Sequence, residues 1–96
     1  SFAYDSYDEF LKAMNLTETQ KQKLQNLNNK TNAAYNSASI KVYYYTKNHS
    51  ELSHEEINEY RDKIINKIKK QYDNELNLIF NSEQQKIYKE YNGLNN

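Results

Sequence analysis

His49 and His54 are the residues of this chain best suited to metal chemistry, because they lie among glutamates in one polar stretch. Imidazole and carboxylate groups are ligands for zinc and nickel. The two histidines are five positions apart, whereas ligands on one helix face are three or four apart. We therefore expect solvated polar residues and no metal site. A metal-responsive sensor through His49 and His54 stays an alternative function.

Catalytic groups are present but poorly arranged. Glu55 and Glu56 are paired carboxylates, yet adjacent side chains on a helix diverge. The chain has no cysteine, which excludes disulfides and thiolate metal sites. Its single glycine, Gly93, leaves no material for a nucleophile elbow or a phosphate-binding loop. We expect a protein that is not an enzyme and uses no cofactor.

Three consecutive tyrosines, Tyr43, Tyr44 and Tyr45, are the most concentrated aromatic feature. On a helix, neighbouring residues point about 100° apart, so the three rings cannot all face one core. At least one ring should be exposed unless a partner covers it. The cluster is either a client-binding or dimer-contact site, or ordinary packing at the tip of a hairpin.

The bulk composition excludes several partner classes. The 96 residues include 13 basic and 13 acidic side chains, and no run of like charge suggests a nucleic-acid arm. No stretch approaches the roughly 20 apolar residues of a membrane span. The N-terminus lacks a basic-then-apolar leader, so we expect the mature form of any exported protein. Hydrophobic residues make up 36% of the chain and include ten tyrosines, which predicts a thin core and a surface used for self-association or client binding.

The elements that hold these residues are helices, because tight hairpins and loops need more glycine and proline than the chain has. The expected fold is all-α, with four helices in the order short, long, long, short. The first is a short helix with Tyr7, Phe10, Leu11 and Met14 on one face, ending at Asn15. Acidic groups near its start suit a helix N-terminus.

Capping boxes mark the later helix starts. Thr17 and Gln20 begin a long helix that runs to about Lys47. Ser53 and Glu56 begin a second long helix.

The last helix is short and starts at Asn81 or Ser82, with Gln84 completing the cap. Gly93 is expected to end it.

Apolar and small residues recur every three or four positions along both long helices, which predicts an antiparallel hairpin. The first stripe is Gln20, Leu24, Leu27, Thr31, Ala34, Ala38, Val42 and Tyr45. The second is Ile57, Tyr60, Ile64, Ile68, Tyr72, Leu76, Ile79 and Phe80, with Ile65 beside it.

The first capping box lies in the sequence LTETQ at positions 16–20, which resembles the LTxxQ motif of the Spy/CpxP family of periplasmic stress proteins. That family carries the motif twice. Residues 79–86, IFNSEQQK, resemble the second copy, ILTPEQKK. Phe80, Asn81 and Ser82 replace its leucine, threonine and proline, while Gln84 is kept. The resemblance covers about 75 residues, from Leu16 to roughly residue 91.

This resemblance implies a periplasmic, ATP-independent chaperone, whose cradle-shaped homodimer binds unfolding proteins on a concave helical face. For the CpxP branch it implies a regulatory subunit that docks on a sensor kinase. We expect client binding at Leu24, Leu27, Ala34, Tyr43, Tyr44 and Tyr45. The helix–helix or dimer seam is expected at Ile57, Ile64 and Ile68. Structural caps are expected at Thr17, Gln20, Asn81 and Gln84.

Overall fold

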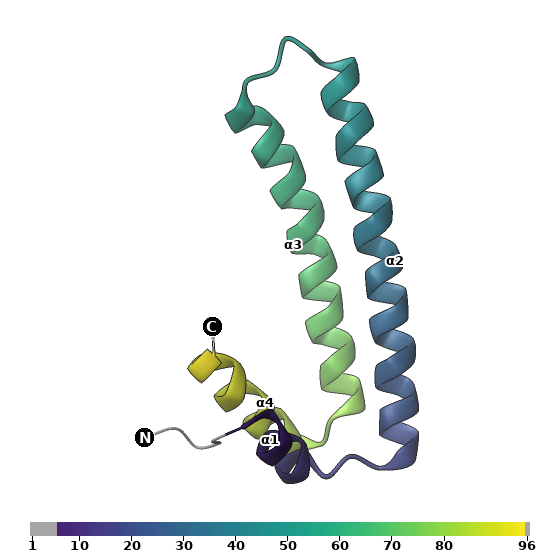
Figure 1. The fold of residues 1–96 in the computed structure, drawn as a ribbon, viewed down its shortest axis with the longest axis vertical. Helices are drawn as coiled ribbons and strands as arrows, with labels where there is room; N and C mark the ends of the chain where they lie inside the picture. The colour runs from purple at the N-terminus through teal and green to yellow at the C-terminus, as the bar shows by residue number, and fades with distance from the viewer. Residues whose placement is uncertain (1–5, 96) are drawn as a thin grey trace. The chain divides into compact units, whose positions relative to one another are not determined.

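The computed structural model describes residues 6–95 and is all-helical over that range. Its helices are α1 (Tyr7–Met14), α2 (Glu18–Asn48), α3 (His54–Ile79) and α4 (Ser82–Asn95) (Figure 1). The predicted order short, long, long, short is confirmed.

The expected end of the last helix is wrong. Gly93 lies inside α4, which continues to Asn95. The φ angle of Gly93 is not positive, so its backbone does not make the left-handed turn that ends a helix at glycine.

Local side-chain contacts explain where α1 begins and ends. The Ser6 hydroxyl accepts a hydrogen bond from the Glu9 amide at 3.2 Å, which caps the first turn. Asn15 adopts the left-handed conformation, with φ 48°, and its amide donates to the Leu11 carbonyl. This confirms the predicted stop. Asp8 and Glu9 place acidic groups in the first turn, where the helix dipole favours them.

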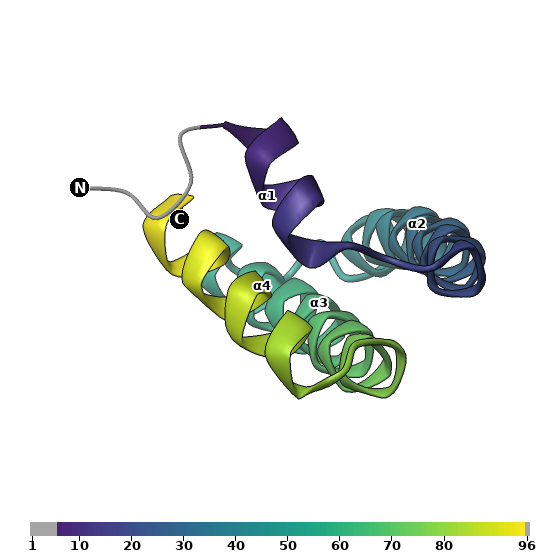
Figure 2. The ribbon, with the colours of Figure 1, turned by 90° about the horizontal axis from the view of Figure 1, so that it is seen from below.

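The chain divides into two compact units. The first unit combines residues 1–25 with residues 76–96, and the second unit, called here the hairpin unit, is residues 26–75. In the first unit α1 and α4 lie side by side (Figure 2). Phe10, Met14, Leu76 and Phe80 form the core of this unit and are at most 6% exposed. The Phe10 ring stacks on the Tyr91 ring with a centroid separation of 4.0 Å.

In the hairpin unit α2 and α3 run antiparallel and are joined by a short turn at residues 49–53 (Figure 1). Between residues 26 and 75, all of which the structure describes, only Leu27 and Ala38 are buried. A pair of helices covers one face of each and leaves the rest to solvent, so this unit has a thin core.

Both predicted stripes are confirmed as the inward-facing sides of the long helices. Every residue of the two stripes is buried or half-buried. Two other side chains among residues 26–49 are half-buried, those of Tyr35 and His49.

Within residues 6–95, no helix combines the length and the apolar content needed to cross a lipid bilayer.

Candidate functional site

Two glutamines form the best-connected polar group of the first unit. The Gln20 side-chain oxygen accepts from the Thr17 amide at 3.0 Å, and the Gln20 amide donates to the Thr17 hydroxyl at 3.1 Å. Gln84 makes the same two bonds with Asn81, at 3.0 and 2.8 Å. The two predicted capping boxes are therefore present, and Asn81, not Ser82, is the cap of α4.

The two glutamine side chains also bond to each other. Gln20 Nε2 donates to Gln84 Oε1 at 2.7 Å, and Gln84 Nε2 donates to Gln20 Oε1 at 3.1 Å. Gln20 Nε2 further donates to the carbonyl of Ile79, and Gln84 Nε2 to the carbonyl of Met14, both at 2.9 Å. Met14 and Ile79 are the last residues of α1 and α3. Each member of this glutamine pair thus caps the start of its own helix and the end of another.

This pairing is a structural device more than a reactive centre. Gln84 is only 6% exposed, and every buried side-chain nitrogen or oxygen within residues 6–95 has a hydrogen-bond partner. Amide groups neither titrate nor attack substrates at neutral pH. The sequence predicts each cap but does not show the bond between them. The only available signal was the repetition of the capping pattern with glutamine in both copies.

The three consecutive tyrosines of the hairpin unit point in different directions. Tyr45 faces inward and stacks on Tyr60 of α3, with ring centroids 3.7 Å apart and planes 8° from parallel. Tyr43 and Tyr44 are 60% and 54% exposed, and their rings meet edge to face at 5.2 Å. The prediction that the rings cannot share one core is confirmed.

Ile40 extends the exposed tyrosines into a patch that sequence reasoning missed. It is 59% exposed. Because Ile40 lies three and four positions before Tyr43 and Tyr44, all three share one face of α2. We call Ile40, Tyr43 and Tyr44 the outer patch. Helical spacing places Ile40 on this face, but a single isoleucine is unremarkable in the sequence.

The other expected binding and seam residues lie on the inward-facing stripes. Leu27 is buried, and the remaining ones are half-buried. These half-buried residues are Leu24, Ala34, Ile57, Ile64 and Ile68. Their placement fits contact between α2 and α3, and their expected roles toward a client or a second copy stay predictions.

The histidines lie at the turn between α2 and α3. His49 Nδ1 is 3.3 Å from Glu51 Oε1, and the His49 ring is 4.4 Å from the Tyr45 ring. The pKa of the Glu51 carboxyl lies below its usual value, mainly because the backbone amide of Glu51 donates to it, with a smaller contribution from His49. His54 is exposed at the start of α3. In residues 6–95, no group of three or more histidine, aspartate or glutamate side chains is placed to hold a metal ion.

The charges of the hairpin unit are segregated although the chain is neutral. Residues 26–48 carry three lysines and no acidic residue. Residues 60–75 carry five basic residues and three acidic residues. All eight basic side chains are exposed. Four glutamates lie in residues 49–59, at the turn and the start of α3. The helical body of the hairpin is therefore basic and its tip is acidic.

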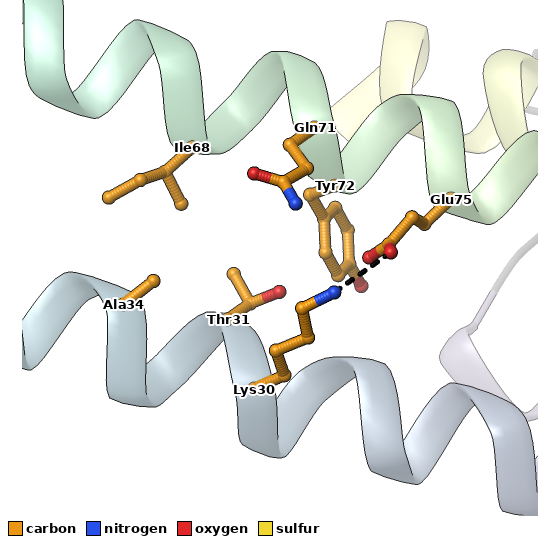
Figure 3. A pocket seen from close by; sticks show the side chains of 7 residues that line it. All are labelled: Lys30, Thr31, Ala34, Ile68, Gln71, Tyr72 and Glu75. Atoms are coloured by element: carbon orange, nitrogen blue, oxygen red, sulfur yellow. Dashed lines mark hydrogen bonds and ion pairs between the residues drawn. The ribbon is translucent and has the colours of Figure 1, made fainter.

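A small cavity of about 40 Å³ lies between α2 and α3 (Figure 3). An ion pair of Lys30 Nζ with Glu75 Oε1, at 3.0 Å, borders it. This volume holds at most a few water molecules, and ligand pockets are several times larger. The lining residues are Lys30, Thr31, Ala34, Ile68, Gln71, Tyr72 and Glu75.

Comparisons of the chain with protein-family models, with curated proteins and with solved structures find no match. The resemblance to the Spy/CpxP family therefore stays a prediction from the two motifs, and the functional argument depends on the geometry above.

Proposed function

We propose that this chain is an ATP-independent, chaperone-like protein that binds unfolding proteins on the surface of its helical hairpin. The observation that carries the proposal is the outer patch. Ile40, Tyr43 and Tyr44 place an aliphatic and two aromatic side chains in solvent on one face of α2. Clustered exposed apolar residues of this kind mark protein interaction sites.

The surroundings of the outer patch favour weak and reversible binding. Its neighbours on the exposed side of α2 include the small polar residues Ser37 and Ser39 as well as Lys41 and Lys47. A few apolar anchors on a polar, pocket-free surface can contact many different sequences, each with modest affinity. A client held this way can leave and fold.

The basic body of the hairpin gives the proposal an electrostatic component. Exposed lysines on α2 and α3 create a positive field beside the outer patch, which raises the rate of encounter with acidic polypeptides. Such steering weakens as added salt screens the charges. Suppression of aggregation should therefore decline with ionic strength for an acidic client more than for a basic one.

The expected location and assembly come from the family resemblance. A periplasmic location suits a folding factor that works without ATP, and a homodimer would bring two outer patches to one client. The alternative from a different class is a regulatory subunit that docks on one envelope stress sensor kinase. Such a subunit would bind a single partner tightly and would not protect unrelated proteins.

The decisive test is light scattering of a chemically denatured model protein diluted into buffer, with and without this chain and without nucleotide. The wild type is expected to suppress aggregation near stoichiometric amounts. The variant Ile40→Gln with Tyr43→Gln and Tyr44→Gln is expected to need roughly tenfold more protein, because aromatic anchors dominate binding energy.

The matched control changes three exposed asparagines of the same helix, Asn29→Gln, Asn32→Gln and Asn36→Gln, and should behave as the wild type. A wild type that does not suppress aggregation would refute the proposal and favour the regulatory subunit. Equal activity of both triple variants would remove the outer patch from the mechanism.

A further inference from the structure

We infer that the hairpin unit opens from its tip, so that α2 and α3 separate there while the first unit stays folded, and that this open state is a client-binding form. Only the statement that the open state binds clients rests on the proposed function. The opening itself follows from how unevenly the two units are held together.

Burial is concentrated in the first unit. Phe10, Met14, Leu76 and Phe80 are each 2–6% exposed, and the buried Gln84 lies among them. The hairpin unit contains a similar number of residues but buries only Leu27 and Ala38, one of them small. Since apolar burial dominates folding free energy, the hairpin unit has less to oppose separation of its helices.

Specific contacts between the helices of the hairpin unit are also unevenly placed. The Tyr72 hydroxyl donates to the Asn28 side-chain oxygen at 2.8 Å, and Lys30 pairs with Glu75. Both contacts lie at the end of the unit remote from the turn. Near the turn, Tyr45 of α2 stacks on Tyr60 of α3.

A small cavity lies in the part of the hairpin unit remote from the turn. Figure 3 shows Thr31 and Ala34 of α2 opposite Ile68 of α3, with the cavity of about 40 Å³ between the helices at this level. Side chains that line a void lose contacts on that side, so apolar packing adds little to the polar contacts at this end. The half next to the turn is held by the buried Ala38, by half-buried apolar side chains such as Ile57 and Ile64, and by one aromatic stack.

Separation uncovers a surface larger than the outer patch. Val42, Ile57, Ile64 and Ile68 are half-buried in the closed hairpin and lie on the facing stripes. In the open state they line two apolar helix faces, bordered by the exposed lysines of both helices. An acidic segment with interspersed apolar residues fits such a surface better than it fits the outer patch alone.

The opening is tested first on the free protein by amide hydrogen exchange with peptide resolution. Separated helices lose the tertiary packing that supplies most helical stability, so their amides exchange on opening. Amides of residues 35–48 and 57–68 are expected to exchange at least tenfold faster than those of residues 76–90. Uniform protection over both units would overturn the inference.

A cavity-filling variant sharpens this result. Ala34→Leu adds apolar volume at the void and keeps a good helix former, so it should slow exchange in the hairpin unit severalfold and leave the first unit unchanged. Ala33→Leu, on the exposed side of α2, is the matched control and should not slow it. Unchanged exchange in Ala34→Leu would show that the cavity does not weaken the hairpin unit.

The link to client binding is tested by cross-linking. Because the native chain has no cysteine, only the introduced cysteines react. Tyr45→Cys with Tyr60→Cys, joined by a short bis-maleimide, should lose most aggregation suppression. The same double variant capped with N-ethylmaleimide lacks the same two rings, so it is the reference against which this loss is measured. Full activity of the cross-linked protein would refute the open binding form and leave the proposed function standing, whereas an inactive wild type would refute the proposed function and leave the exchange result valid.

Discussion

Replacing Gln84 with alanine should destabilise the protein more than any surface change of comparable size. The side chain makes four hydrogen bonds, with the Asn81 amide, the Met14 carbonyl and both polar atoms of the Gln20 amide. Alanine removes all four. It also leaves the end of α1 without its side-chain cap and breaks the contact between the two capping boxes.

The size of the effect follows from the burial of the group. A net contribution of about 0.5–1.5 kcal/mol per hydrogen bond gives a total of roughly 2–6 kcal/mol. Gln20 is half-buried, so water can reach part of its amide after the change. This compensation places the expected loss near the lower end, at about 3 kcal/mol. For a domain of this size the melting temperature should fall by roughly 15 °C.

Urea unfolding followed by far-ultraviolet circular dichroism measures the loss directly. Gln25→Ala, at an exposed position of α2, is the matched control and should change stability by less than about 0.5 kcal/mol. A double-mutant cycle of Gln20→Ala with Gln84→Ala should give a coupling energy of at least about 1 kcal/mol, because the two side chains bond to each other. A loss below about 1 kcal/mol in Gln84→Ala, or additive effects in the cycle, would refute the role assigned to the glutamine pair.

Gln84→Glu adds a pH test with a defined sign. A carboxylate at this buried position faces two acceptor oxygens, those of Met14 and Gln20, so its folded-state pKa should lie above the unfolded value. The variant should therefore gain stability as the pH falls through that raised pKa, while its deficit is largest at neutral pH. A deficit that does not change between neutral and acidic pH, relative to the wild type, would contradict this geometry.

Other predictions address the caps, the core and the turn. Thr17→Ala should cost about 1 kcal/mol in thermal melts because it removes an N-cap, whereas the exposed Thr19→Ala should be nearly neutral; equal effects would contradict the capping assignment. Met14→Ala, at a position that is 2% exposed, should cost roughly 2–4 kcal/mol in urea unfolding, and a smaller loss would mean that the first unit is not the stable core. Zinc or nickel should leave the melting temperature unchanged, and a rise that disappears in the His49→Ala with His54→Ala variant would establish the metal-sensor alternative.

Helix starts were predictable from the sequence because their determinants are local. The bonds between Thr17 and Gln20, between Ser53 and Glu56, and between Asn81 and Gln84 each span three positions. A side chain that reaches an amide three residues away needs no tertiary structure to be recognised. Choosing between Asn81 and Ser82 required the structure, since either residue type can cap a helix.

The outer patch was only partly predictable. The 100° step between helical neighbours shows that three adjacent tyrosines must diverge, but it does not say which ring faces inward. The stripe that ends at Tyr45 indicated the inward ring, and the stack on Tyr60 agrees with it. Ile40 was overlooked because an isolated exposed isoleucine is unremarkable by itself and gains meaning only beside Tyr43 and Tyr44.

The sequence by itself determined the number and order of the helices, where they begin to within a residue, and the inward stripes, because periodicity and capping act over three or four residues. Tertiary structure alone decided that Gln20 bonds to Gln84, 64 positions away, and that burial gathers around this pair and not along the hairpin. Contacts between residues so distant depend on how helix ends meet in space, which no local pattern records. The distribution of lysines and glutamates along the hairpin can be read from the sequence, whereas the exposure of its eight basic side chains comes from the structure.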